Sequence, residues 1–204
     1  MTSDSIIRLD LGCGQQPAPG FTGVDLEPIN SDVIVFDLFG GQVWPWEDES
    51  VDEMRASHVI EHIPADMVVP YKLGEDSDTP RQFAHRRCAG KRKDRLLFFF
   101  DEAYRIAKPG AQFTIAWPSL KSSDAFRDPT HRRFLPLEFT HYLSAIGRKT
   151  MKVDHYEVNC DWHVTRCELK PTDPKTQGMP AWSGSDLAGR WDAQCSFTCV
   201  LEKP

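Results

Sequence analysis

Short apolar runs that end in glycine or aspartate recur through the first half of the chain. Four of these runs predict strands, at Ile6–Leu11, Phe21–Leu26, Val33–Asp37 and the more polar Val51–Ser57. Lys93–Ala107 instead has apolar residues at helical spacing, and Lys-Pro-Gly ends that pattern. Strands that alternate with helices predict an α/β fold, with a mostly parallel sheet and helices on both faces.

The second half of the chain adds further strands and two interruptions. The predicted strands are Gln112–Trp117, Lys152–Val158 and Cys195–Leu201. Residues at about 64–95 have the scattered charges and prolines of an insertion, and residues 170–194 are rich in Pro, Gly, Asp and Ser. No second core follows either segment, so residues 1–204 are expected to form a single domain with an inserted lid.

Composition narrows the class of protein. A net charge of −6 argues against a broadly basic nucleic-acid coat protein. No apolar run approaches the roughly 20 residues that span a bilayer, and the first residues do not have the pattern of a secretion signal. The six cysteines are then expected to be reduced thiols. We therefore expect a soluble, cytoplasmic enzyme.

Aspartates follow three consecutive predicted strands. Gly12 and Gly14 come directly after the first strand and Asp10, and glycines there let the backbone approach a ligand. Asp25 ends the second strand, where acids in nucleotide-binding folds hold a ribose diol, and Asp37 ends the third. Each aspartate alone is also a common turn residue. Together the three predict a crevice that binds a nucleoside.

In this order the motifs resemble those of compact class I S-adenosylmethionine-dependent methyltransferases. The likeness covers roughly residues 6–118 and rests on five stretches: Leu9–Gly14, Gly23–Leu26, Asp37–Trp46, Ser57–Ile63 and Asp101–Gly110. The resemblance implies a Rossmann-like, seven-stranded methyltransferase sheet, mostly parallel with an antiparallel last strand, and Cys195–Leu201 suits that strand. Beyond about residue 120 no motif matches a known substrate class.

The resemblance also implies S-adenosylmethionine as the cofactor and assigns residues to it. The methionine part is assigned to Asp10, Gly12, Gly14, Ser57 and His58. The nucleoside part is assigned to Asp25 at the ribose, and to Asp37 and the Leu38 backbone at the adenine.

One feature departs from the family pattern. Only about ten residues separate Gly14 from Asp25, whereas a βαβ connection usually needs a dozen or more. Either the crossover helix is a single turn, or the loop runs straight back. In both cases Gln15 or Gln16 is expected to replace the usual helix N-terminus beneath the carboxylate of the cofactor.

Candidate general bases lie after the fourth and fifth predicted strands. Methyl transfer is an in-line displacement, so the protein aligns the reactants and removes a proton where the acceptor must lose one. His131 is the first choice, in a substrate loop at about 118–135, with Asp128 beside it and His58 after the fourth strand. The alternative is that Asp128-Pro129 opens a turn and His131 caps the next segment.

Five residues are predicted to contact the acceptor: Glu61, His62, Trp117, Arg127 and Arg132. Glu61 and His62 are also compatible with shaping the pocket or capping a short helix. The fourth strand is followed by Ser57-His58-Val59-Ile60 and not by the Asp-Pro-Pro-aromatic stretch of methyltransferases that act on base amines. The predicted acceptor is therefore a small or nucleotide-like molecule of unidentified structure.

Two other functions remain open at this stage. Seven basic residues gather in the insertion: Arg81, Arg86, Arg87, Lys91, Arg92, Lys93 and Arg95. They favour an anionic partner such as nucleic acid, and the alternative is a solvated lid whose charge only preserves solubility. The other alternative is a non-catalytic subunit that binds S-adenosylmethionine.

The cysteines have only loosely zinc-like spacing. Cys160, His163 and Cys167 lack the tight turn that holds two ligands of a zinc knuckle. Cys195 and Cys199 alternate along one face of a predicted strand, where small buried thiols are ordinary. No metal site is predicted.

Overall fold

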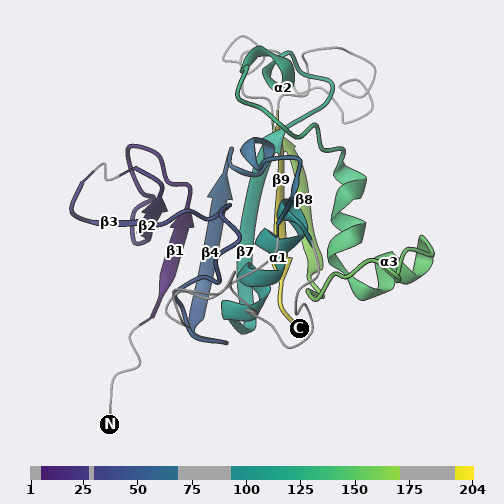
Figure 1. Ribbon diagram of the computed structural model, residues 1–204, viewed down its shortest axis with the longest axis horizontal. Coiled ribbons are helices and arrows are strands. Elements are labelled where there is room, and N and C mark those ends of the chain that lie inside the picture. Colours follow the sequence, from purple (N-terminus) through teal and green to yellow (C-terminus); the bar gives the residue numbers. More distant parts are fainter. Residues whose placement is uncertain (1–5, 28–29, 69–92, 171–195) are drawn as a thin grey trace, which may run out of the picture.

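The computed structural model describes residues 6–27, 30–68, 93–170 and 196–204 (Figure 1). One sheet contains seven strands: β1 (Arg8–Leu11), β2 (Thr22–Asp25), β3 (Val33–Val35), β4 (Val51–Ser57), β7 (Ala107–Pro118), β8 (His163–Lys170) and β9 (Ser196–Glu202). The α-helices are α1 (Arg95–Ile106), α2 (Asp124–Arg127) and α3 (Ala145–Thr150), and the 3-10 helices are η1 (Ile60–His62) and η2 (Leu137–Leu143). None of these described helices is long and apolar enough to cross a membrane.

The strands lie in the order β3-β2-β1-β4-β7-β9-β8, from left to right in Figure 1. Strands β1, β2, β3, β4 and β7 pair in parallel, and β9 is antiparallel to both β7 and β8. The prediction of a mostly parallel, seven-stranded α/β sheet with an antiparallel last strand is therefore confirmed. The carboxyl ends of the parallel strands share one edge, where open α/β sheets bind ligands.

One face of the sheet carries the hydrophobic core. Met54 and Ala56 of β4 pair in register with Phe113 and Ile115 of β7, and all four are buried. Phe99 of α1 packs on this face, with its ring centroid 6.2 Å from that of Phe113. Alternate residues from Met54 onwards in β4 and from Ala111 to Trp117 in β7 are thus buried and apolar, because these positions face the core.

The opposite face of the sheet is polar. Arg8 pairs with Glu53 at 3.1 Å, and Arg55 pairs with Asp10 at 3.3 Å. Part of the loop between β1 and β2 covers this face, because the Cγ atom of Pro17 lies beside Gly23. Helices α1 and η2 pack on the apolar face of the sheet, where Phe100 of α1 contacts both Phe113 and Phe139.

The strand predicted at Lys152–Val158 is wrong. These residues form turns, in which the Tyr156 amide donates to the Val153 carbonyl at 3.0 Å. The strand that precedes β9 is His163–Lys170 instead. Its residues Val153, Tyr156 and Val158 are of types that favour strands, but this segment pairs with no strand among the described residues.

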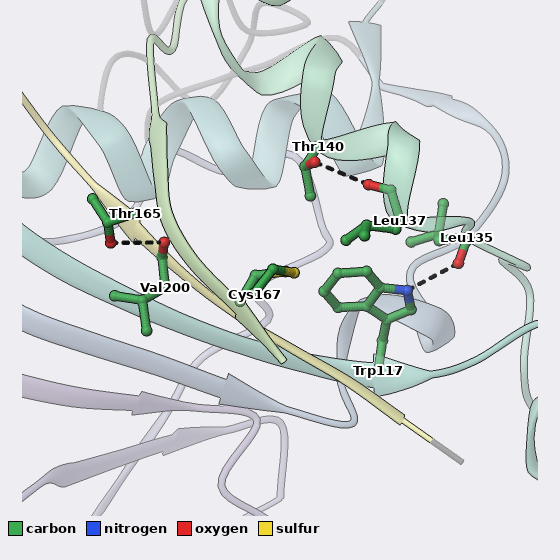
Figure 2. Close-up of a disulfide and its surroundings, with 8 residues drawn as sticks. Trp117, Leu135, Leu137, Thr140, Thr165, Cys167 and Val200 are labelled. Carbon is green, nitrogen blue, oxygen red and sulfur yellow. Dashed lines mark hydrogen bonds between the residues drawn. A yellow bond between two sulfur atoms is a disulfide. The ribbon is translucent and has the colours of Figure 1, made fainter. Parts of the chain in front are cut away.

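The expectation of reduced thiols is wrong for Cys167 and Cys199, which form a disulfide between β8 and β9 (Figure 2). They face each other in the antiparallel register, with their Cα atoms 4.2 Å apart. Because β8 was not predicted, the pairing of these two cysteines was not predicted either. Cys13 and Cys160 have free thiols, and Cys88 and Cys195 lie outside the described residues.

The ends of the predicted insertion pair with each other. Strand β5 (Met67–Val68) is antiparallel to β6 (Lys93–Asp94), which leads directly into α1. Lys93 is buried in an ion pair with Asp101, and Arg95 pairs with Asp66 at 2.7 Å. Two of the seven basic residues are therefore bound within the fold. The other five, between residues 81 and 92, lie outside the described residues.

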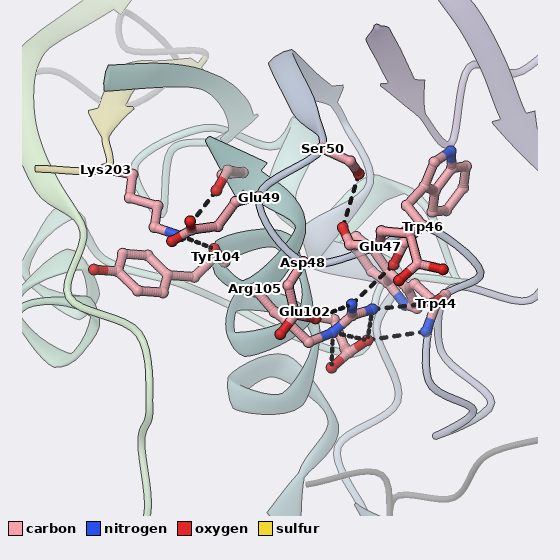
Figure 3. Close-up of polar contacts among 11 residues, drawn as sticks. Trp44, Trp46, Glu47, Asp48, Glu49, Ser50, Glu102, Tyr104, Arg105 and Lys203 are labelled. Atoms are coloured by element: carbon pink, nitrogen blue, oxygen red, sulfur yellow. Dashed lines mark hydrogen bonds and ion pairs between the residues drawn. The ribbon is translucent and has the colours of Figure 1, made fainter. Parts of the chain in front are cut away.

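A buried ion pair joins α1 to the loop before β4 (Figure 3). Glu102 accepts a hydrogen bond from the Trp44 amide at 2.9 Å and pairs with Arg105 at 2.7 Å. The Arg105 guanidinium also donates to the carbonyls of Trp44 and Trp46, at 2.9 and 2.8 Å. The Trp-Pro-Trp segment is thus fixed to α1 through its backbone.

We predict that Glu102→Gln lowers the free energy of unfolding by about 3–5 kcal/mol, because it leaves the buried guanidinium of Arg105 without its main counter-charge. Asp48→Asn is the matched control, since Asp48 pairs with the same guanidinium but is largely exposed, and it should cost less than about 1 kcal/mol. Urea denaturation of both variants measures the difference. Equal losses of stability in the two variants would contradict the prediction that the buried Glu102–Arg105 pair contributes more than the exposed Asp48–Arg105 pair.

Candidate active site

The glycine loop after β1 folds back onto the end of β2. Gly12 and Gly14 have φ angles of +66° and +58°, in the left-handed region that favours glycine. The Gly12 amide donates to the Val24 carbonyl at 2.7 Å, and the Gly14 amide donates to the Asp25 carboxylate at 2.8 Å. The loop and the first acid of the predicted nucleoside crevice are therefore in direct contact.

No helix forms between β1 and β2, all of whose residues the structure describes. Of the two alternatives, the loop runs straight back, through a turn in which the Phe21 amide donates to the Ala18 carbonyl at 3.0 Å. Gln15 and Gln16 are exposed on this loop. Their role beneath the carboxylate of the cofactor stays a prediction.

Asp10 is 3% exposed and is held by protein groups on both sides. Its carboxylate accepts a hydrogen bond from the Ala18 amide at 2.8 Å, and its other oxygen lies 3.3 Å from Arg55. Burial raises the pKa of Asp10, and the Ala18 N–H and the charge of Arg55 oppose that rise. Asp10 thus joins β1 to the returning loop and to β4.

Asp25 and Asp37 follow the neighbouring strands β2 and β3. The two oxygens of the Asp25 carboxylate accept from the Gly14 amide and, at 2.7 Å, from the Leu26 amide. The Asp37 carboxylate is exposed and accepts from the Phe39 amide at 2.9 Å, while the adjacent Leu38 is buried. Both acids therefore stand at the carboxyl edge of the sheet, which is the placement that binding of a nucleoside requires.

His58 has an unusual backbone at the end of β4. Its φ angle is +57°, a rare value for a residue with a side chain, and its amide donates to the Ala116 carbonyl of β7 at 2.9 Å. Its Nδ1 lies 3.1 Å from Oε1 of Glu61, and this hydrogen bond raises the pKa of His58 against the opposing effect of burial. Strained residues of this kind cluster at functional sites.

His131 lies beside Glu61 and His62, although about 70 residues separate it from them in the chain. Their ligand-type atoms all lie within 4.8 Å of one another, and the two imidazole rings meet edge to face with centroids 4.7 Å apart. The amides of Arg132 and Arg133 donate to the Glu61 carbonyl at 2.7 and 2.9 Å. These backbone bonds fix the loop after α2 against η1.

Hydrogen bonds determine which nitrogen of each imidazole carries the proton. Nδ1 of His131 lies 2.8 Å from the Ala125 carbonyl, which can only accept, so the neutral ring keeps its lone pair on Nε2. The Thr130 hydroxyl donates to Asp128 at 2.6 Å and is 3.0 Å from Nδ1 of His62, so it accepts from that nitrogen. Both rings thus present Nε2 as the free acceptor, and Oδ2 of Asp128 lies 4.0 Å from that of His131.

Trp117 does not face a substrate, contrary to the prediction. It is 1% exposed and lies between Phe139 and Phe197 on the core face, and its indole N–H donates to the Leu135 carbonyl at 2.9 Å (Figure 2). The physical reason is its register, since position 117 shares the face of β7 on which Phe113 and Ile115 pack against the core.

The two predicted substrate arginines are exposed. Arg127 pairs with Asp124 at 2.8 Å within α2, and the Arg132 guanidinium donates to the Pro129 carbonyl at 2.9 Å. Neither guanidinium forms a hydrogen bond with the histidine pair among the described residues, although the Arg132 amide donates to the Glu61 carbonyl. Their contact with an acceptor stays a prediction.

A shallow cavity of about 350 Å³ lies on the polar face of the sheet. It is lined by Phe21, Glu53, Arg55, Ala56, Ser57, Thr114, Ala116 and Thr198. Of the residues predicted for the cofactor only Ser57 borders it, so the cavity is separate from the glycine loop. Sequence reasoning missed Arg55, which pairs with Asp10. The signal in the sequence was a charged residue, Arg55, between the apolar Met54 and Ala56 of a predicted strand.

Solved structures similar to this chain are described as methyltransferases. A SAM-dependent methyltransferase from Archaeoglobus fulgidus is 15% identical, with a TM-score of 0.56 over 98% of this chain and 87% of that one. A SAM-dependent methyltransferase from Thermotoga maritima, described as a possible histamine N-methyltransferase, is 13% identical, with a TM-score of 0.52 over 98% and 83%. No family model and no curated protein matches the sequence.

The same fold also carries other chemistry. The [4+2]-cyclase SpnF is 15% identical to this chain, with a TM-score of 0.51 over 99% of this chain and 76% of that one. At these identities the likeness shows the Rossmann-like fold of S-adenosylmethionine-dependent methyltransferases and does not show the reaction.

We predict that Gly12→Ala destabilises the protein by about 2–4 kcal/mol. A Cβ atom there meets Cγ2 of Val59 at 2.6 Å, and the positive φ adds backbone strain. Gly14→Ala should cost only about 1–2 kcal/mol, because its φ is also positive but no atom lies within 4 Å of the added carbon.

Val59→Ala supplies the control for this prediction, because it removes the two methyl groups that cause the clash. A double-mutant cycle compares the double variant Gly12→Ala/Val59→Ala with the two single variants by urea denaturation. The double variant should lose about 1–2 kcal/mol less stability than the sum of the two single losses. Additive losses would mean that the Gly12 loop moves freely away from Val59.

Proposed function

We propose that the protein is an S-adenosylmethionine-dependent methyltransferase that acts on a small or nucleotide-like acceptor. The observation that carries this proposal is the contact between the Gly12–Gly14 loop and Asp25 at the carboxyl edge of a sheet with this strand order. A glycine loop beside a strand-end acid is the arrangement that holds a nucleoside with its attached chain in α/β folds.

The residues at this edge fit the cofactor chemically. Asp25 and Asp37 offer carboxylate oxygens to the ribose hydroxyls and the adenine amino group, and Leu38 supplies a buried apolar neighbour. Open space surrounds Gly14, so a ligand can lie directly against the backbone there. When bound, S-adenosylmethionine supplies the methyl group on a sulfonium. The side chains at this edge would hold and orient it.

The histidine cluster would serve the acceptor. His131 presents an unprotonated Nε2 that can take a proton from an acceptor hydroxyl or amine, and the Asp128 carboxylate would stabilise the resulting imidazolium. The hydrogen bond to Glu61 raises the pKa of His58, which would favour a positive charge on this ring at the same edge. A general base of this kind contributes typically about 10²–10⁴-fold to the rate.

The two alternative functions have weaker support. Lys93 and Arg95 are engaged inside the fold, so they add little to a surface for nucleic acid. A non-catalytic subunit that binds S-adenosylmethionine would bind the cofactor without methyl transfer. The likeness to a cyclase shows that the fold alone does not exclude roles of this type.

We predict that S-adenosylhomocysteine raises the melting temperature of the protein, whereas ATP and NAD do not. Asp25→Ala should weaken binding of S-adenosylhomocysteine by about 10–100-fold, since it removes the charged acceptor for the ribose hydroxyls. Isothermal titration calorimetry measures the affinity, and Asp32→Ala is the control because Asp32 is an exposed aspartate next to β3.

Asp25 also accepts a hydrogen bond from the Gly14 amide, so Asp25→Ala removes a contact within the loop as well as a contact to the ligand. The melting temperature of Asp25→Ala without ligand measures the first effect separately. A preference for ATP or NAD, or equal affinities for Asp25→Ala and Asp32→Ala, would contradict the proposed cofactor site.

A further inference from the structure

Glu61 has a buried carboxylate oxygen without a partner. The residue is 2% exposed, and its Oε1 lies 3.1 Å from Nδ1 of His58. Its Oε2 is fully buried, and no hydrogen bond reaches it from the residues that the structure describes. Buried polar atoms are almost always paired, because burial of an unpaired oxygen sacrifices its hydration. Among the described residues, this oxygen is therefore available to a ligand.

Two imidazole rings lie beside this carboxylate. Glu61, His62 and His131 can each offer one ligand atom, and the three atoms lie within 4.8 Å of one another. In a tetrahedral zinc site, with bonds of about 2.0–2.1 Å, ligand atoms are about 3.4 Å apart. Small rotations of the side chains are sufficient to close that difference.

The hydrogen bonds around the two rings are those of metal-binding histidines. Nδ1 of His131 is fixed by the Ala125 carbonyl, and Nδ1 of His62 is fixed by the Thr130 hydroxyl, which is held in turn by Asp128. Outer partners of this type orient the ring and leave Nε2 unprotonated and directed at the metal. Neither ring needs to change its tautomer to bind a cation.

We propose that Glu61, His62 and His131 form a binding site for a divalent transition metal, for which Zn²⁺ fits best. Two imidazoles and one carboxylate suit zinc and related transition metals, whereas Mg²⁺ and Ca²⁺ prefer ligand sets made of oxygen alone. The orphan Oε2 supplies the carboxylate ligand, and Oε1 remains on His58.

Three protein ligands would leave a fourth position for water or for an oxygen of a substrate. The exposed Asp128 lies 4.0 Å from Nε2 of His131. A bound metal would use the lone pair that the metal-free protein would use to accept a proton. A bound metal would instead lower the pKa of an acceptor hydroxyl directly. Metal binding itself does not rest on the proposed methyl transfer.

The test is metal binding by the full-length protein after treatment with a chelator and dialysis. Titration with Zn²⁺ should give one bound equivalent, and Co²⁺ should give the absorption bands of a tetrahedral site. Each of His62→Ala, His131→Ala and Glu61→Gln should weaken Zn²⁺ binding by at least about 100-fold, since each removes a ligand. His155→Ala, which changes an exposed histidine outside the cluster, should bind like the unchanged protein.

A milder pair of variants covers the risk that a ligand variant fails to fold. Thr130→Ala removes the acceptor of the His62 Nδ1 proton and should weaken Zn²⁺ binding by about 10–100-fold, while Thr130→Ser keeps the hydroxyl and should restore it. Circular dichroism checks that both variants are folded. Equal affinities for the alanine and serine variants would overturn the site.

Two further results would also overturn it. The first is a protein that binds no Zn²⁺. The second is an equivalent of zinc that persists in His62→Ala and His131→Ala, which would place the metal on thiols. Binding of S-adenosylhomocysteine is measured on the same samples. A protein that binds S-adenosylhomocysteine but not zinc contradicts only the metal site, and one that binds only zinc contradicts only the proposed function.

Discussion

Two adjacent buried carboxylates in α1, Asp101 and Glu102, organise the rest of the fold. Each is neutralised by a cation, Lys93 or Arg105, and each accepts hydrogen bonds from the backbone of a distant segment. Asp101 binds the amides of Asn159 and Cys160, both at 2.9 Å, and Glu102 binds the Trp44 amide. Burial of a charge is tolerated only with such pairing, so the position of α1 determines the course of both segments.

Glu61 is buried like these two carboxylates, but its hydrogen bonding is incomplete among the described residues. The acids of α1 are fully satisfied by protein groups, whereas Glu61 is equally buried and leaves Oε2 unpaired. The loop after α2 is fastened to it by the amides of Arg132 and Arg133, so the gap is not the result of a loose loop. A rigid, half-satisfied carboxylate next to two oriented imidazoles is what a binding site requires before its ligand arrives.

The sequence predicted those parts of the fold in which local pattern and long-range packing agree. Strand β4 matches the predicted Val51–Ser57, in which polar residues separate the buried apolar residues Val51, Met54 and Ala56, and α1 lies within the predicted helix. Prediction failed where pairing between distant segments decides the outcome. Lys152–Val158 contains residues that favour strands but has no partner strand among the described residues, and the Cys167–Cys199 disulfide depends on a register that the sequence does not reveal. Of the candidate site, the residue types at the strand ends were predictable, whereas the meeting of Glu61 with His131 was not.

The short connection between β1 and β2 links the two halves of the site. Without room for a crossover helix, the loop is held by Asp10, whose two oxygens bind the Ala18 amide and Arg55. Arg55 comes from the polar face of β4, and the neighbouring Ser57 and His58 lead from that strand into η1 and Glu61. The Asp10–Arg55 pair therefore ties the start of the glycine loop to β4, the strand that leads into η1 and Glu61. A helix normally supplies rigidity at this connection, and here this ion pair and the hydrogen bonds from Gly12, Gly14 and Ala18 supply it.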